Sequence, residues 1–264
     1  MSVKTEYEFY NEGFFGYGEK GDFDYFSLEH FLPIAFMLFA IFMIYRFREF
    51  FREWRGEENF RFVLAFIILI VEMSYYWRLM YVGSAKPEEG TLMTKLPFQV
   101  CQWSAILASF MLMKKSRNLY SVCYFICLTL GVVPLLTPAV ISTTGPEHYR
   151  YYQFWLEHML PIIAVFYMTF VHGFRVRPKD MIKPLSLLLI LAVFSIFANN
   201  AIPEANYLYL AADTDGDSIA NLLPQNMTVR LTVYVIAVLS LFALVYQPMR
   251  VTRKKEEKKI LSHA

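Results

Sequence analysis

Hydrophobic residues gather in seven long blocks along the chain, and short polar or charged stretches separate these blocks. An α-helix rises about 1.5 Å per residue, so about 20 apolar residues can cross a hydrocarbon core of roughly 30 Å. The pattern therefore predicts an all-α polytopic membrane protein with seven transmembrane helices. The helices are expected over residues 28–45, 62–82, 96–113, 119–141, 152–173, 184–202 and 228–249.

Composition narrows the class further. The 264-residue chain is 56% apolar and 18% charged, whereas soluble globular chains are about 45–50% apolar and about 25% charged. This excludes a soluble enzyme domain and a disordered chain, and the long apolar runs disfavour an outer-membrane barrel. We expect one membrane domain at 28–249, between an acidic, aromatic N-terminal segment at 1–27 and a basic tail at 250–264. Because acidic rather than basic residues precede the first block, we interpret it as a span and not as a cleavable signal peptide.

Basic residues are unequally shared between the loops. Eighteen of the 25 Lys and Arg residues follow the first, third, fifth and seventh predicted spans, and six lie in the other loops. Cytoplasmic loops carry the excess of Lys and Arg in membrane proteins. The distribution predicts an N-terminus outside the cell and a C-terminus inside it.

The basic tail also suggests a partner. Its sequence RKKEEKK, at residues 253–259, is expected to lie on anionic lipid headgroups, with about 1 kcal/mol for each basic residue near the surface. The alternative is a solvated anchor that only fixes the topology. The chain carries no signature of nucleic-acid binding.

Several polar and ionisable side chains fall within the predicted spans, where they are costly and mark functional sites. In the predicted orientation they all lie in outer halves of spans, and the inner halves contain little that is comparable apart from His172 near the interface. Asn206 and Tyr207 follow in the next outer loop. The residues within the spans are Glu72, Arg78, Gln99, Cys101, Gln102, Glu157, His158, Asn199 and Asn200.

This common depth has two interpretations. The polar residues could form a site, or they could only join helices through hydrogen bonds worth about 0.6 kcal/mol each in membrane bundles. A thiol, an imidazole and carboxylates at one depth offer more chemistry than helix association requires, which favours a site.

Other candidate features carry less weight. Cys123 and Cys127 lie four residues apart without polar company, and we interpret them as packing residues. No HExxH motif or Cys pair with metal-ligand spacing occurs, so no metal and no other cofactor is expected. The carboxylates of Asp213, Asp215 and Asp217 alternate as in calcium loops, but the Gly comes too early and no Glu closes the loop, so an acidic turn is expected.

Four segments occur in an order that resembles a known family. They are LPFQVCQWSAILA at 96–108, PLLTPAVIS at 134–142, YQFWLEHMLPIIAVFY at 152–167 and NYLYL at 206–210. Together they resemble the YwaF-like family of bacterial integral membrane proteins, which is related to the eukaryotic transmembrane protein 164 acyltransferases. The resemblance covers roughly residues 28–249 and implies a bacterial plasma membrane protein.

The resemblance also implies an activity. It points to an acyltransferase acting on glycerophospholipids, with Cys101 as the nucleophile and His158 as its partner, and with Asn206 and Tyr207 matching the Asn-Tyr element of the family. The expected partners are a phospholipid acyl donor and a lysophospholipid acceptor. The sequence departs from the family at Gln99, where the family has a His two residues before the Cys. A Gln can still donate a hydrogen bond.

Acyl transfer through a thiol needs a base, a group that orients the base and donors for the oxyanion. Glu157 projects about 100° away from its neighbour His158 on a helix, so Glu72 or Asn199 is expected to orient the base. Gln99, Gln102 and Asn200 are candidate oxyanion donors.

Three alternatives to an acyltransferase remain at this point. A lipid esterase would differ only in passing the acyl group to water. A transporter or a ligand-sensing receptor with an outward-facing pocket would also explain seven spans, although transporters place polar groups nearer the midplane. A non-catalytic role in assembly is the third.

Overall fold

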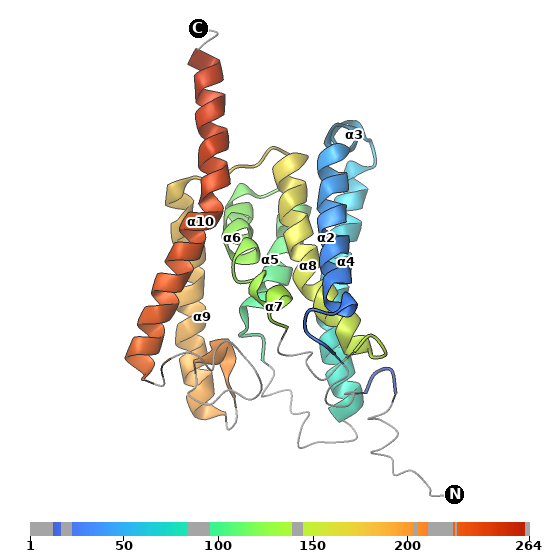
Figure 1. Cartoon of the computed structure of the whole chain (residues 1–264), viewed down its shortest axis with the longest axis vertical. Helices are drawn as coiled ribbons and strands as arrows, with labels where there is room; N and C mark the ends of the chain where they lie inside the picture. The colour runs from blue at the N-terminus through green and yellow to red at the C-terminus, as the bar shows by residue number, and fades with distance from the viewer. Residues whose placement is uncertain are drawn as a thin grey trace, which may run out of the picture.

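The computed structural model describes residues 13–16, 23–83, 96–138, 145–202, 205–210, 224 and 226–261, and within them it contains helices and loops but no strand. The predicted all-α class is confirmed (Figure 1). The long helices are α2 (Leu28–Arg46), α4 (Glu57–Gly83), α5 (Val100–Lys114), α6 (Arg117–Leu128), α8 (Tyr149–Phe170), α9 (Ile182–Ala201) and α10 (Met227–Leu261). The short ones are α3 (Arg48–Glu53), α7 (Val133–Leu136), η3 (Pro178–Met181) and η4 (Tyr207–Tyr209).

The outer surface of the bundle is apolar. Large side chains such as Phe36, Leu189 and Phe197 are more than half exposed, which is the reverse of a soluble fold and fits a lipid environment. Among the described residues, five helical stretches are long and apolar enough to cross a membrane: Leu28–Arg46, Glu57–Met80, Arg117–Leu136, Pro178–Ala201 and Met227–Arg253. Helix α5 is apolar but shorter, and α8 carries charged residues. The seven-span count stays a prediction.

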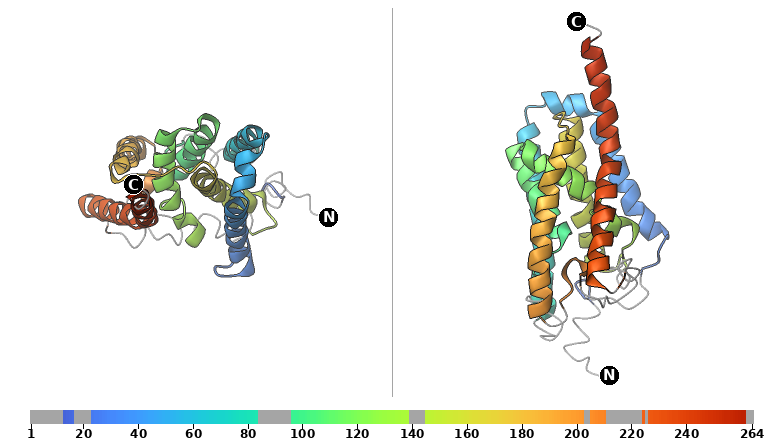
Figure 2. Two further views of the ribbon diagram at one scale, coloured as in Figure 1. Left: turned by 90° about the horizontal axis from the view of Figure 1, so that it is seen from above. Right: turned by 90° about the vertical axis from the view of Figure 1, so that its left-hand side faces the viewer.

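Helix α8 occupies the centre of the bundle. It packs against α2, α4, α5 and α6, while α9 and α10 lie together at one side (Figures 1 and 2). Most of its residues are buried, including Trp155 and Tyr167, which have almost no exposed surface. A side chain on almost any face of α8 therefore meets another helix. This explains how one helix can supply several groups to a site.

The basic loops lie at one end of the bundle. Helix α3, the connection from α8 to α9 and the C-terminus are all at the upper end in Figure 1, and the N-terminus is at the opposite end. The alternation of basic loops in the sequence therefore corresponds to a real separation in space. Which end faces the cytoplasm stays a prediction.

The predicted helix at 119–141 is wrong in its extent. Helix α6 ends at Leu128, and the short α7 follows at Val133–Leu136. The N–H of Gly131 donates to the carbonyl of Ile126, and a Cβ at this position would lie 2.7 Å from the carbonyl oxygen of Cys127. A close backbone approach that only Gly allows thus ends the helix.

Two other boundaries differ from the prediction. Helix α5 begins at Val100 instead of residue 96, because the side-chain Oε1 of Gln102 accepts a hydrogen bond from the N–H of Gln99 and closes the helix start. Helix α10 does not end near residue 249 but continues to Leu261, so the first part of the basic tail is helical.

A short N-terminal segment, residues 13–16, is attached to the lower end of the bundle. Arg78, which is buried, donates hydrogen bonds to the carbonyls of Phe15 at 3.0 Å and Gly16 at 2.6 Å. The N–H of Tyr149 donates to the carbonyl of Phe14 at 2.7 Å. Arg78, placed by its sequence among the polar groups of the site, therefore holds this segment against α4 and α8.

Candidate active site

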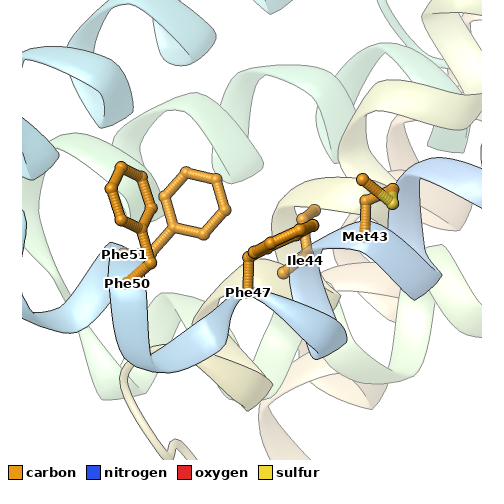
Figure 3. A pocket seen from close by; sticks show the side chains of 5 residues that line it. All are labelled: Met43, Ile44, Phe47, Phe50 and Phe51. Atoms are coloured by element: carbon orange, nitrogen blue, oxygen red, sulfur yellow. The ribbon is translucent and has the colours of Figure 1, made fainter.

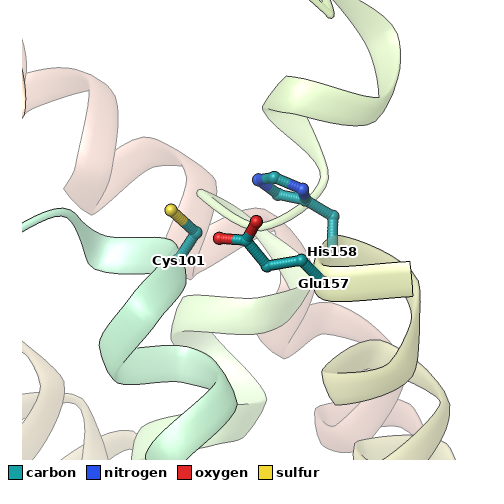
Figure 4. A group of neighbouring side chains, drawn as sticks. All are labelled: Cys101, Glu157 and His158. Carbon is teal, nitrogen blue, oxygen red and sulfur yellow. The ribbon is translucent and has the colours of Figure 1, made fainter. Parts of the chain in front are cut away.

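Cys101 lies in the first turn of α5, beside the Glu157 and His158 side chains of α8 (Figure 4). It is the second residue of the helix, where unpaired backbone N–H groups and the helix dipole favour a negative charge on sulfur. The backbone N–H of Gln102 faces this sulfur. Burial and the neighbouring carboxyl groups of Glu157 and Glu72 act against a thiolate, so the thiol needs a base to take its proton.

Two consecutive residues of α8 reach this thiol. One ligand atom each from Cys101, Glu157 and His158 lies within 4.8 Å of the other two (Figure 4). Glu157 and His158 are both less than 8% exposed. The structure therefore brings together the two residues that the resemblance implied, and it adds a carboxylate to them.

The three helices carry the site at one depth. At about 1.5 Å per residue, Cys101, Glu72 and His158 lie roughly 20 Å along their helices from the ends at Lys114, Glu57 and Phe170. These ends belong to the part of the bundle with the basic loops. In a hydrocarbon core of roughly 30 Å the site would lie in the half away from those loops.

The imidazole of His158 has a defined tautomer. Its Nδ1 lies 2.7 Å from the carbonyl oxygen of Phe154. A carbonyl can only accept a hydrogen bond, so Nδ1 carries the proton and Nε2 is left with a free lone pair. A neutral His158 can therefore take a proton at Nε2.

Glu157 is held by polar neighbours from its own helix. Its carboxylate accepts a hydrogen bond from Nε2 of Gln153 at 2.8 Å and forms an ion pair with Arg150 at 3.5 Å. The Cys101 thiol lies within 4.8 Å of it. Glu157 and its neighbour His158 both lie near Cys101, because α8 is enclosed by other helices on most of its faces. Whether Glu157 orients the base stays a prediction.

Glu72 lies next to this group, on α4. It is 3% exposed, it interacts electrostatically with Glu157 and Arg150, and within the described part of the chain its Oε2 has no hydrogen-bond partner. The structure thus gives Glu72 a place beside Glu157. Whether Glu72 orients the base stays a prediction. We call Cys101, Glu157, His158, Glu72, Arg150 and Gln153 together the Glu157 cluster.

Three tyrosines from α4 and η4 interact electrostatically with the thiol. Nε2 of Gln102 donates a hydrogen bond to the hydroxyl of Tyr76 at 2.7 Å, which leaves the proton of that hydroxyl free to be donated elsewhere. Tyr75, Tyr76 and Tyr209 all interact electrostatically with Cys101. Tyr209 is a neighbour that the sequence did not single out, because it comes from the short η4 helix in a loop.

The remaining predicted residues form a different network. Asn199 accepts from the N–H of Tyr207 at 2.7 Å and donates to its carbonyl at 3.1 Å. The hydroxyl of Tyr207, whose pKa burial raises, accepts from the N–H of Leu96 at 2.7 Å. Gln99 accepts from the N–H of Leu208 at 3.1 Å and donates to the carbonyl of Asn206 at 3.5 Å.

This network joins the start of α5 to the end of α9 and to η4. These residues therefore connect elements of the fold, which was the alternative to a role in a site. Asn200 takes no part in it. Its amide donates to the carbonyl of Ile196 within α9, and the side chain is exposed.

The sequence missed a second buried charged group at the end of the bundle with the basic loops. Glu57 accepts from Nε of Arg61 at 2.7 Å, from His172 at 2.8 Å and from the hydroxyl of Tyr167 at 3.0 Å, and it pairs with Lys115 at 3.3 Å. We call these five residues the Glu57 cluster. Glu57, Arg61 and Lys115 fall in loops of the predicted topology, so the survey of polar residues within the spans did not include them.

An apolar pocket of about 370 Å³ opens beside α2 and α3 (Figure 3). It is lined by Met43, Ile44, Phe47, Phe50 and Phe51. Aromatic residues and Met are the lining expected for an acyl groove, but this pocket lies toward the end with the basic loops, far along the bundle from Cys101. The candidate calcium loop at 213–218 lies outside the described residues.

A helical bundle with an apolar surface and a buried polar site is an integral membrane protein. The model of the TMEM164 family matches residues 25–257, nearly the whole chain, and the chain therefore belongs to the TMEM164 family. The resemblance seen in the ordered motifs is thus confirmed, and the family is compatible with an acyltransferase. No curated protein and no solved structure matches the chain.

Proposed function

We propose that this protein is a membrane acyltransferase or transacylase that moves a fatty acyl group on glycerophospholipid through a thioester on Cys101. One observation carries the proposal: Cys101, Glu157 and the imidazole of His158 lie within 4.8 Å of one another inside the bundle. This is the nucleophile and base arrangement of acyl transfer, in a chain whose family is compatible with that activity.

The first half-reaction loads the enzyme. The Cys101 sulfur attacks the ester carbonyl of the donor lipid while Nε2 of His158 takes the thiol proton. The tetrahedral intermediate collapses with cleavage of the bond to the glycerol oxygen. That oxygen leaves as an alcohol with the proton from His158, and the acyl group stays on sulfur as a thioester.

The second half-reaction transfers the acyl group from Cys101 to the acceptor. Nε2 of His158 takes the proton of a lysophospholipid hydroxyl, and the hydroxyl oxygen attacks the thioester carbonyl. Collapse releases the new ester, and the thiolate of Cys101 regains the proton from His158. If water replaces the lysolipid, the same steps give a free fatty acid, so the esterase alternative shares this site.

The negative charge on the carbonyl oxygen needs a donor in both half-reactions. The hydroxyl of Tyr76 accepts a hydrogen bond from Gln102 and can donate its own proton, and it interacts electrostatically with Cys101. We assign this role to Tyr76, with Gln102 as the residue that positions it.

The setting of the site is part of the proposal. With the N-terminus outside and seven crossings, Cys101 lies in the outer half of a bacterial plasma membrane, at a depth suited to the ester carbonyls of outer-leaflet lipids. The helical basic tail then lies on the cytoplasmic side, against anionic headgroups.

The test is product analysis with purified protein in lipid nanodiscs. A phospholipid with a labelled acyl chain is incubated with and without lysophospholipid, using the wild type, Cys101→Ala and the matched control Cys127→Ala, which changes a buried Cys outside the site. Labelled diacyl product that requires added lysolipid and Cys101 supports the proposal. Product formation that is unchanged in Cys101→Ala overturns it, and no turnover by any protein would favour a transporter or sensor.

A further inference from the structure

We propose that the thiol of Cys101, the carboxylate of Glu157 and Nε2 of His158 form a binding site for Zn²⁺, and that the bound ion blocks the thiol. For three atoms that are at most 4.8 Å apart, some point lies within 4.8/√3, or about 2.8 Å, of all of them. Bonds from Zn²⁺ to S, N and O donors are about 2.0–2.3 Å long. Shifts of about 0.5–0.8 Å would therefore bring all three donors to bonding distance.

The donor set has the chemistry of a zinc site. One sulfur, one imidazole nitrogen and one carboxylate oxygen are the three kinds of ligand that Zn²⁺ takes in proteins, and three protein ligands leave a fourth position open. No metal-ligand spacing appears along the chain, because two ligands come from α8 and the third from α5.

The residues behind the ligands match those of known metal sites. A His that binds a metal usually donates its second ring N–H to a carbonyl or carboxylate, and a carboxylate ligand is usually held by hydrogen bonds. Nδ1 of His158 is bonded to the carbonyl of Phe154. Gln153 and Arg150 hold the Glu157 carboxylate. Both ligands from α8 are therefore already oriented.

A buried carboxyl oxygen beside the three ligands supplies a second, independent observation. Glu72 and Glu157 are two buried carboxylates that interact with each other, and the basic group that interacts with both is Arg150. Oε2 of Glu72 is buried and has no hydrogen-bond partner among the described residues. A divalent cation would give this buried oxygen a partner, and Glu72 could lose its proton and move to the open fourth position.

Binding would change the chemistry of the site. Coordination releases the thiol proton of Cys101 to solvent, and the bound ion occupies both the sulfur and Nε2 of His158, so neither the nucleophile nor the base is available. Ion binding rests on the geometry alone, whereas inhibition rests on the proposed acyl transfer.

The test is titration of the purified, metal-free protein with Co²⁺, which reports on a zinc site through its spectrum, followed by competition with Zn²⁺. We expect one ion per chain, with a thiolate-to-cobalt charge-transfer band that Zn²⁺ removes. Cys101→Ser should lose the band, Glu157→Gln should weaken binding at least tenfold, and Cys123→Ser should behave as the wild type. No band in the wild type, or a band that survives in Cys101→Ser, would overturn the proposal.

A folding check and an activity assay separate the two proposals. Each variant is first required to elute as the wild type does in gel filtration, and Glu157→Gln supplies a second variant that keeps the thiol. Acyl transfer by a protein that binds no Co²⁺ contradicts the zinc site and leaves the acyltransferase intact. If the protein binds one Co²⁺ per chain but its metal-free form transfers no acyl group, the zinc site is supported and the acyltransferase is contradicted.

Discussion

The Glu157 cluster and the Glu57 cluster each bury a carboxylate between helices, but they differ in what is left unpaired. In the Glu57 cluster, three donors bind Oε1 and Lys115 pairs with Oε2. In the Glu157 cluster, Oε2 of Glu72 has no hydrogen-bond partner in the described structure, and Nε2 of His158 keeps a free lone pair. Saturated polar groups stabilise a fold, and unsaturated ones are available to a substrate.

The two clusters also lie at different positions along the bundle. Glu57 joins the start of α4 to the α5–α6 turn through Lys115 and to the end of α8 through Tyr167, and Arg61 reaches the carbonyl of Leu112 on α5. The Glu57 cluster thus fastens one end of the bundle. The Glu157 cluster lies roughly 20 Å away along the helices, so changes in one should leave the other intact.

The sharpest separation is expected from two His substitutions. His158→Gln removes the proton acceptor and should lower acyl transfer by about 10²–10⁴-fold, which is the usual contribution of a general base. His172→Gln changes a His of the Glu57 cluster and should leave the rate per folded molecule within about twofold. Initial rates in nanodiscs measure both, and equal losses in the two variants would contradict the division of roles.

The next largest effect concerns stability. Glu57→Gln leaves Arg61 buried without its counter-charge and should reduce the free energy of unfolding by about 3 kcal/mol. Glu58→Gln, at the exposed neighbouring position, should change it by less than about 0.5 kcal/mol. Unfolding in mixed micelles measures both. A Glu57→Gln protein as stable as the wild type would show that the Glu57 cluster fastens nothing.

A backbone substitution tests a part of the bundle outside both clusters. Gly131→Ala places a Cβ 2.7 Å from the carbonyl oxygen of Cys127, which a packed backbone cannot absorb, and about 2 kcal/mol of destabilisation is expected. Gly173→Ala meets no atom within 4 Å but has a φ of +67°, so about 1 kcal/mol is expected. The same unfolding assay applies, and a reversed order would contradict the close approach at Gly131.

The smallest expected effect comes from a substitution that tests which residues belong to the Glu157 cluster. Asn199→Ala removes two hydrogen bonds to Tyr207 and should cost about 1 kcal/mol of stability, at about 0.6 kcal/mol per bond. Asn200→Ala loses only an exposed bond within α9 and should have almost no effect. If Asn199→Ala instead lowers acyl transfer more than tenfold at unchanged stability, Asn199 belongs to the site.

The depth of polar residues could be predicted from the sequence, but not their direction around each helix. Hydropathy and helical rise placed Cys101, Glu72 and His158 at one level, and the structure keeps them there. Asn199 and Gln99 lie at a similar level but face η4 instead. The direction in which a side chain points around its helix depends on how the helices pack, and a single sequence does not show that packing.

Two other outcomes have local physical causes. Glu157 was not expected to orient the base, since its side chain projects about 100° away from that of His158, and the structure nevertheless places both near Cys101 because helices enclose α8. Glu57 was overlooked because charged residues near a span end are usually solvated, whereas here the end of α8 and the α5–α6 turn cover it. The break after α6 depended on the backbone approach at Gly131, which hydropathy does not report.

The central claim is that Cys101 carries the acyl group during transfer. Intact-protein mass spectrometry after brief incubation with phospholipid, without an acceptor, tests it most directly. The account predicts a mass increase of one acyl group that maps to Cys101 and is removed by neutral hydroxylamine. This acyl adduct should form much more slowly in His158→Gln. Acyl transfer by the wild type with no adduct at Cys101, or with the same adduct in Cys101→Ser, would contradict it.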